Sequence, residues 1–243
     1  MIILSIGMPR AGSGWYYNLT NDLMLAGSAQ DARRIRQRYH LQSILTEVNC
    51  NIGAFTPRRL MLVLLPALMG NTFVIKAHAG PTPLALFLAR RGLLRPTYIY
   101  RDPRDAMLSA FENGERARRD GRSNAFSHLV DFETSLEFMQ QYVYISEAWI
   151  ACPQALHTRY EDLLTDYDTE VKRLVNFLPL QPDDPGLQEI IEKYRPESSQ
   201  PDQKGLHFSK GKIGRFRQKM SAEQQTRMAQ VFSAYLEQMN YNL

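Results

Sequence analysis

The sequence contains few cysteines and no long apolar run. Its 243 residues include only two cysteines, Cys50 and Cys152, too few for a disulfide framework, which indicates a reducing compartment such as the cytoplasm. The longest apolar stretch, residues 60–69, contains a proline and is far shorter than the ~20 residues that cross a bilayer. The N-terminus lacks the basic segment and cleavage site of a signal peptide. We therefore expect a complete, soluble, cytoplasmic chain without an integral membrane segment.

The charge of the chain is nearly balanced. Lys and Arg number 29 against 25 Asp and Glu, a formal net charge of +4 at pH 7. This excess is too small to indicate a protein that coats nucleic acid, but it allows a local pocket for a small polyanion. No cluster of His, Cys and carboxylate residues has metal-ligand spacing. The sequence therefore predicts no nucleic-acid partner and no metal, and it leaves the oligomeric state open.

Short apolar runs alternate with helical patterns along the chain, which is typical of a parallel α/β sheet. We predict an α/β fold in one domain, residues 1–243, with a central parallel sheet flanked by helices. The strand, turn and helix at the N-terminus form a phosphate-loop unit, and we expect a P-loop, nucleotide-kinase-like, three-layer sandwich. Strands are expected at residues 1–6, 72–76, 97–100 and 155–160. Helices are expected at residues 18–25, 57–68, 83–91, 103–111, 129–150, 168–177, 184–194 and 221–239.

A glycine-bearing turn, GMPRAGSGW at residues 7–15, joins the first strand to the first helix. Backbone N–H groups in such a turn converge on an anion, and the helix N-terminus adds a positive partial charge. A nucleotide-kinase loop needs Lys and then Ser or Thr where Ser13 and Gly14 stand, so a Mg–nucleotide site is disfavoured. A dinucleotide fingerprint needs a small residue where Tyr17 stands. What remains is a phosphate cradle whose side-chain cation is Arg10.

This turn resembles the PKSGTTW loop of the sulfotransferases that use 3′-phosphoadenosine 5′-phosphosulfate (PAPS). Arginine in place of that lysine is a familiar bacterial form. The resemblance implies that the loop holds the 5′-phosphosulfate and that the tryptophan stacks on the adenine. Ala11 and Gly14 each lack a hydroxyl group that the family loop has. The backbone amides and Ser13 would therefore make more of the contacts with the phosphosulfate. The residues implied are Arg10, Ala11, Gly12, Ser13, Gly14 and Trp15.

A second motif, YIYRDPRDAMLS at residues 98–109, resembles the family element R-[ND]-P-x-D-x-x-x-S. The resemblance implies that Arg101 and Ser109 bind the 3′-phosphate, which separates PAPS from ordinary nucleotides. Arginine suits this task because its planar fork meets phosphate oxygens in pairs. Taken alone, the motif could also be a capped helix start with surface ion pairs. Tyr160 opens a further element, YEDL, whose tyrosine approaches the adenine in the family.

Near the C-terminus, FSKGKIG at residues 208–214 resembles the R-K-G-x-x-G element that covers the nucleotide in family members. Lys210 and Gly211 match, but Ser209 stands where the leading arginine is expected. Another cation nearby could replace that charge, and residues 195–220 as a whole are expected to form the nucleotide-covering loop. The candidates for the replacement are Lys212, Arg215 and Arg217.

Lys76-Ala77-His78 closes the second predicted strand and resembles the K-T-H element of cytosolic sulfotransferases, whose histidine is the general base. Of the five histidines, only His78 follows a buried strand beside the expected cleft. An imidazole can take a hydroxyl proton at neutral pH. The resemblance implies that the acceptor oxygen attacks sulfur in line, that His78 removes its proton, and that Arg10 and Lys76 stabilise the leaving phosphate.

The acceptor is not readable from the sequence. Residues 28–70 and 112–150 match no family motif and are expected to shape its pocket, with residues 112–124 as an exposed loop. A small-molecule, lipid or carbohydrate acceptor with a hydroxyl or amine group fits these observations. Two alternatives stay open: a phosphate-loop kinase for a small molecule, and a non-catalytic protein that binds 3′-phosphoadenosine 5′-phosphate (PAP). Arginines at 33, 34, 36, 38 and 116–122 favour an anionic or sugar-rich acceptor, although such runs are more often solvated.

Overall fold

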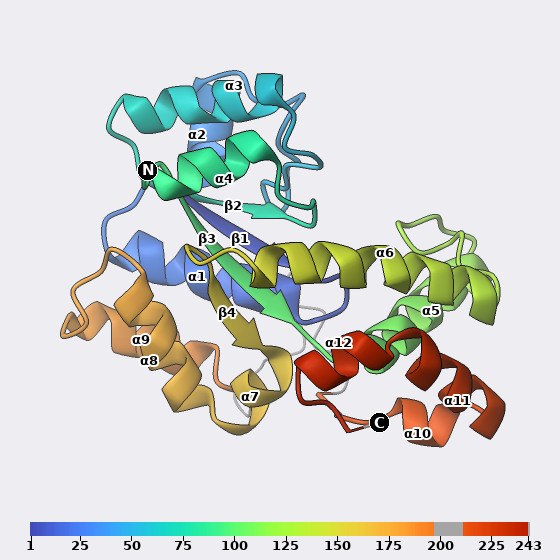
Figure 1. Ribbon diagram of the computed structural model, residues 1–243. Coiled ribbons are helices and arrows are strands. Elements are labelled where there is room, and N and C mark those ends of the chain that lie inside the picture. The colour runs from blue at the N-terminus through green and yellow to red at the C-terminus, as the bar shows by residue number, and fades with distance from the viewer. Residues whose placement is uncertain (197–210, 243) are drawn as a thin grey trace.

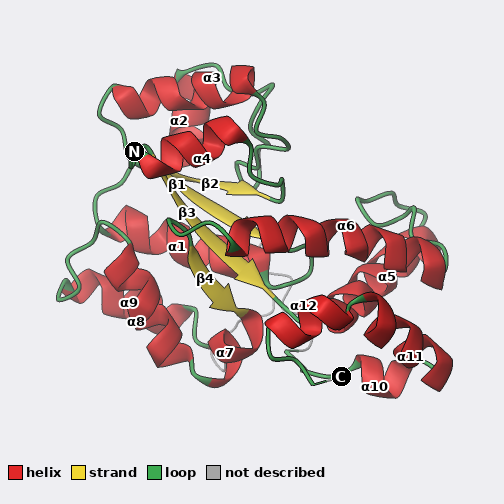
Figure 2. Cartoon of the chain, viewed as in Figure 1, coloured by secondary structure: helices red, strands yellow, loops and turns green. Residues whose placement is uncertain are grey.

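A computed structural model describes residues 1–196 and 211–242 of the chain. Its centre is a sheet of four strands in the order β2-β1-β3-β4, and all three neighbouring pairs are parallel (Figures 1 and 2). This confirms the predicted α/β fold with a central parallel sheet. The strands are β1 (Ile2–Gly7), β2 (Phe73–Ala77), β3 (Leu94–Tyr100) and β4 (Leu156–Arg159).

Helices connect and cover the strands, and several begin with proline at the first helical position after a Thr or Asp cap, where the missing N–H costs nothing. Within the described residues, none of these helices has the length and hydropathy needed to cross a membrane. The helices are α1 (Ser13–Ala26), α2 (Ala32–Arg38), α3 (Pro57–Leu68), α4 (Pro83–Arg90), α5 (Pro103–Arg119), α6 (Phe132–Ile150), α7 (Tyr160–Thr165), α8 (Tyr167–Phe177), α9 (Pro185–Lys193), α10 (Phe216–Lys219), α11 (Ala222–Val231) and α12 (Ser233–Gln238).

The sheet is buried on both faces because successive side chains of a strand point to opposite sides. From β1, Ile2 and Leu4 pack with residues of α3 and α4, whereas Ile3 packs with residues of α1 and α8 on the other face. A third apolar cluster joins α5, α6, α11 and α12 to the loop after β1. Because the strands are parallel, their carboxyl ends lie at the same edge of the sheet, and the loop after β1 lies at this edge.

Several expected boundaries differ from the structure; for example, β3 begins at Leu94 and α6 begins at Phe132. The first helix already begins at Ser13, and the C-terminal helix is divided at Phe232 into α11 and α12. Residues 112–119 belong to α5, so the expectation of a loop there was wrong. This part of α5 is held by Arg118, whose Nη1 donates to two carbonyl oxygens of the following segment at 2.8 and 3.0 Å. The polar composition of residues 112–119 reflects a partly exposed helix.

Candidate active site

The loop after β1 contains two residues with left-handed backbone conformations, and only one of them is a glycine. Gly12 caps α1 with φ 76°, and Arg10 has φ 65°, a left-handed value that is uncommon for a side chain with a Cβ. A Cβ added at Gly12 would lie 2.7 Å from two carbons of the Tyr160 ring. Glycine is therefore required where the loop passes Tyr160, and this contact joins the first motif to the YEDL element.

A cavity of about 420 Å³ lies at the carboxyl edge of the sheet. It brings together eleven of the fourteen residues that the motifs indicate. Ala11 is not among them, because its side chain is fully buried in the cluster with α5 and α6. Ser209 and Lys210 lie outside the described residues. The indicated residues that line the cavity are Arg10, Gly12, Ser13, Gly14, Trp15, Lys76, His78, Arg101, Ser109, Tyr160 and Gly211.

The two motif arginines meet at this cavity. Arg10 Nε donates to the Ser109 hydroxyl at 3.1 Å, and Arg101 Nη1 donates to the Arg10 carbonyl at 3.3 Å. Arg101 is 7% exposed, and its guanidinium lies 4.5 Å from the centre of the Tyr160 ring. Burial, and then the charges of Arg101 and Arg116, lower the pKa of Arg10. The cations are thus close enough to destabilise one another when no anion lies between them.

Lys76 adds a third cation to the same cavity. It lies near the end of β2 and is 8% exposed. Within the described residues it forms no ion pair, and burial together with the charge of Arg10 lowers its pKa to about 8. A buried ammonium group without a counter-charge is costly. An anion in the cavity would relieve this cost.

His78 follows β2 and is held in one orientation by the backbone. Its Nδ1 lies 2.6 Å from the carbonyl oxygen of Gly7. A carbonyl only accepts hydrogen bonds, so Nδ1 carries the proton and Nε2 keeps its lone pair. Burial and the charge of Lys76 lower the pKa of His78 to about 4. The imidazole is therefore neutral at physiological pH and can accept a proton at Nε2.

Asp105, which is not among the residues that the motifs indicate, holds the segment after residue 210 in place. Asp105 is 1% exposed, and its carboxylate accepts from the backbone N–H groups of Gly214 and Phe216 at 2.6 and 3.0 Å. It also pairs with Arg101 at 3.3 Å, while Arg101 donates to the Lys212 carbonyl at 3.0 Å. Asp105 is the second aspartate of the RDPRD sequence, but the sequence does not show that its partners lie more than 100 residues further along the chain.

The cations considered as replacements for the charge missing at residue 209 differ in position. Lys212 and Arg215 line the cavity. Arg215 already pairs with Glu112 at 2.6 Å, whereas Arg217 lies over the Phe216 ring at 4.7 Å. Lys212 is therefore the exposed cation of this group at the cavity.

The remainder of the second motif is structural. Arg104 is 2% exposed and pairs with Asp102 at 2.9 Å, so these are buried ion pairs and not the surface pairs of the alternative interpretation. The Asp102 N–H donates to Glu161 at 3.1 Å, and the hydroxyl of Tyr241 donates to the other Glu161 oxygen at 3.0 Å. This network ties α5, α7 and the C-terminal residues together beside the cavity.

Trp15 has both a packing role and a place in the cavity wall. Its indole N–H donates to the Tyr194 carbonyl at 2.9 Å, and its ring stacks on Tyr167 with centroids 6.1 Å apart. It is 5% exposed and lines the cavity. Its ring also meets Tyr160 edge-on. The structure therefore accounts for Trp15 as a core residue even without a nucleotide.

Part of the cavity lining comes from the two segments that match no family motif. Thr46, Asn49 and Asn51 contribute polar groups from the connection between α2 and α3. This connection extends the sheet edge beside β2, since the Ile52 N–H donates to the Lys76 carbonyl at 2.9 Å. The Asn51 Oδ1 is buried without a hydrogen-bond partner in the described part of the chain. The other segment, residues 112–150, contributes the aromatic residues Phe126, Phe138 and Tyr142 to the lining.

Among residues 1–196 and 211–242, no group of three or more His, Cys, Asp or Glu side chains could hold a metal ion. The charged groups that converge on the cavity are cations. A parallel sheet whose first strand leads through a glycine-bearing loop into a helix, with cations gathered at that loop, defines a phosphate-loop protein.

The family model described as "Sulfotransferase domain" matches residues 2–240. The chain therefore belongs to the sulfotransferase family, and it is an enzyme of sulfuryl transfer. A search of curated protein sequences gives no significant match.

Solved structures resemble the whole chain at low sequence identity. Retinol dehydratase in complex with androsterone and PAP is 18% identical, with a TM-score of 0.60, over 100% of this chain and 82% of that chain. A mouse sulfotransferase complexed with PAP is 14% identical, with a TM-score of 0.61, over 97% of this chain and 84% of that chain. A Mycobacterium avium sulfotransferase is 14% identical, with a TM-score of 0.51, over 100% and 77%. At these identities the likeness establishes the fold.

Proposed function

We propose that the chain transfers the sulfuryl group of PAPS to a hydroxyl group of a small molecule and releases PAP. The observation that carries this proposal is the meeting of Arg10, Lys76 and Arg101 at one cavity. In the described residues Lys76 has no carboxylate partner, and the pKa values of Arg10 and Lys76 are lowered. Such a site favours a polyanion of small size. Crystal structures of the similar retinol dehydratase and mouse sulfotransferase hold PAP.

The nucleotide is proposed to lie along the loop and the two motif arginines. Arg10 and the backbone amides at the start of α1 would hold the 5′-phosphosulfate. Arg101 and Ser109 would hold the 3′-phosphate, a role supported by the Arg101 Nε, which is buried without a hydrogen-bond partner in the described part of the chain. Gly211 and Lys212 would cover the ligand at the cavity rim. No metal is needed in this arrangement, because fixed cations balance the phosphates.

His78 is proposed as the general base. The acceptor oxygen forms a bond to sulfur while the bond from sulfur to the bridging oxygen of the 5′-phosphate breaks. The acceptor proton passes to His78 Nε2, and the electron pair of the broken bond stays on the leaving phosphate. Arg10 and Lys76 stabilise this charge from fixed positions in a poorly hydrated site. Bound phosphates raise the pKa of His78 again, because a nearby negative charge favours the imidazolium.

The acceptor is proposed to have an apolar body and at least one hydroxyl group. Phe126, Phe138 and Tyr142 offer flat apolar surfaces to the cavity, and Thr46 and Asn51 offer polar groups. Ring systems with hydroxyl groups fit both kinds of lining residue. Retinol dehydratase has been crystallised with retinol and with androsterone, each of which is such a molecule.

A cytoplasmic, bacterial-type enzyme is part of the proposal. Both cysteines of the chain are buried and free, as expected in a reducing compartment. Arginine at position 10 corresponds to the bacterial form of the loop.

The test is a transfer screen with labelled PAPS across phenols, sterols, sugars, lipids and small alcohols, with and without EDTA. The proposal predicts label transfer to one acceptor class, unaffected by EDTA. Transfer of the γ-phosphate from Mg–ATP without transfer from PAPS would instead support the kinase alternative. Tight PAP binding with no transfer to any acceptor class would support a non-catalytic binding protein.

A further inference from the structure

Helix α3 exposes an apolar face on the side opposite its packed face. Leu60, Val63, Leu64 and Ala67 are buried in the core cluster. At about 100° per residue the exposed apolar side chains fall within an arc of roughly 120° on the other side of the helix. A helix that is apolar on both faces is normally covered on both. The exposed residues are Met61 (55%), Leu62 (39%), Leu65 (51%), Leu68 (62%) and Met69 (63%), the last directly after the helix.

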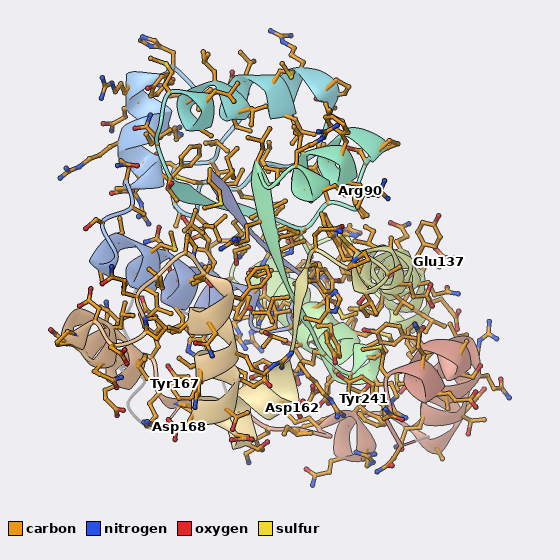
Figure 3. All side chains as sticks on the ribbon, turned by 60° about the vertical axis from the view of Figure 1, so that its left-hand side comes forward. Arg90, Glu137, Asp162, Tyr167, Asp168 and Tyr241 are labelled. Carbon is orange, nitrogen blue, oxygen red and sulfur yellow. The ribbon has the colours of Figure 1, made fainter. Side chains whose placement is uncertain are left out.

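No described element covers this face. Helix α3 lies at the outer edge of the molecule in Figure 1, and it keeps that place in the turned view of Figure 3. The face is convex because it is the outside of a single helix. None of its five apolar side chains lines the cavity, so the face is separate from the proposed reaction.

The surroundings of this face are strongly basic. Between Glu47 and Asp102 the sequence contains no Asp or Glu, although the whole chain has 25 of them. Arg58 lies exposed in the first turn of α3, and Arg90 and Arg91 end the neighbouring α4, with Arg90 at the molecular surface in Figure 3. In the described residues these three arginines form no ion pair.

Helix α2 brings further cations to the C-terminal end of α3, the end at which α4 also ends. Asn71, which follows α3, donates to the Tyr39 hydroxyl at 3.2 Å. The Arg38 guanidinium lies 5.8 Å from the centre of the Tyr39 ring, and Arg34 is exposed on the same short helix. Arg58 therefore lies at the start of α3, and Arg38 lies close to its end.

We propose that this α3 face docks the protein onto the surface of an anionic lipid bilayer. Apolar side chains with arginines around them match the boundary between acyl chains and phosphate headgroups, where a helix lies in the plane of the surface. The juxtaposed cations are complementary to anionic lipid, each contributing to binding near the surface. A convex face of Leu and Met without Trp or Tyr lacks the aromatic anchors that dominate protein interfaces. The bilayer is therefore the occupant that the chemistry favours.

The test is cosedimentation of the full chain with vesicles of phosphatidylcholine alone or of phosphatidylcholine with phosphatidylglycerol. We expect binding to the anionic vesicles that weakens with added salt. The double variant Leu65→Gln/Leu68→Gln should lower the partition coefficient about tenfold, because two apolar side chains no longer enter the boundary. The variant Arg58→Gln/Arg90→Gln/Arg91→Gln should lower it to a similar extent and reduce the salt dependence.

A matched control is Val130→Gln/Tyr144→Gln, which changes two exposed apolar side chains, 59% and 74% exposed, outside the α3 face. This control should bind like the parent chain. Three results would overturn the proposal: no binding to anionic vesicles, equal loss in the control, or equal binding to neutral vesicles. A dimer that the Leu65→Gln/Leu68→Gln variant abolishes, with no vesicle binding, would show that a second copy covers the face. Each variant should have the same midpoint temperature of thermal unfolding as the parent chain, which shows that the variant keeps its fold.

Discussion

Lys76 and His78 lie two residues apart at the end of β2, and their pKa values limit the pH range of the reaction from opposite sides. Burial lowers the pKa of both, to about 8 for Lys76 and about 4 for His78. The proposed base works only when it is neutral, and the proposed stabilising cation works only when it is protonated. The free enzyme is therefore competent between these two values.

The pH dependence of kcat/KM for PAPS should have this form. It should rise through about pH 4 as His78 loses its proton, stay level, and fall through about pH 8 as Lys76 loses its own, because kcat/KM reports the free enzyme. Lys76→Arg should remove the alkaline limb, since a guanidinium stays charged. An alkaline limb that is unchanged in this variant would assign it to another group.

Loss of His78 should affect chemistry and not nucleotide binding. We expect His78→Ala to lower kcat by about 10²–10⁴-fold, the usual contribution of a general base, with the Kd for PAP nearly unchanged in a titration. The matched control is His157→Gln, because His157 bonds to the Trp149 carbonyl and does not line the cavity. Turnover retained in His78→Ala would place the base elsewhere.

Asn51 should contribute to acceptor recognition. Its Oδ1 is buried without a partner in the described residues, and Asn51 lines the same cavity as the aromatic side chains. Asn51→Leu should raise the KM for the acceptor about tenfold, the cost of one lost hydrogen bond to a buried group, without changing the Kd for PAP. A shift in the PAP affinity with no change in acceptor KM would contradict this assignment.

At the scale of elements, the cavity depends on how α5 holds the segment that follows residue 210. Asp105 receives two backbone N–H groups of this segment and the Arg101 guanidinium. The two N–H groups come from residues more than 100 positions after Asp105 and Arg101, and the aspartate is almost completely buried. The covering segment is therefore positioned by a side chain within α5 that is not exposed to a ligand.

Removal of this carboxylate should destabilise the fold. Asp105→Ala leaves Arg101 buried without its counter-charge, which should cost about 3–5 kcal/mol in the free energy of unfolding. The comparison is Asp162→Ala, since the Asp162 side chain is 50% exposed and 4.0 Å from Arg159. This variant should cost under about 1 kcal/mol. Equal denaturation midpoints for the two variants would show that Asp105 is not a structural anchor.

The sequence indicated most elements and the motif residues, because these depend on local patterns. Buried strands and proline-started helices carry their own signals, and the residues of the motifs lie at strand ends that a parallel sheet brings together. The extension of α5 to Arg119 was not predicted, because its support comes from contacts between Arg118 and distant carbonyl groups. The partners of Asp105 and the wall formed by Asn51 and Phe138 depend on tertiary packing in the same way.

At the scale of the whole molecule, the fold separates two surfaces of different chemistry. One is the cavity at the carboxyl edge of the sheet, lined by Arg10, Lys76 and Arg101. The other is the apolar α3 face, with arginines around it, at the outer edge (Figure 1). Both arise from a chain of nearly balanced total charge, so local gathering of cations, and not net charge, provides the attraction for anions.

In the proposed complex, the two arginine-bearing turns enclose one adenosine with phosphates at both its 3′ and 5′ positions. Calorimetric titration of the unmodified chain with PAP, and separately with adenosine 5′-phosphate, tests it most directly. We predict saturable 1:1 binding of PAP, at least about tenfold tighter than adenosine 5′-phosphate because an additional charge-assisted pair forms. Failure of PAP to bind, or equal affinity for the two nucleotides, would contradict the claim.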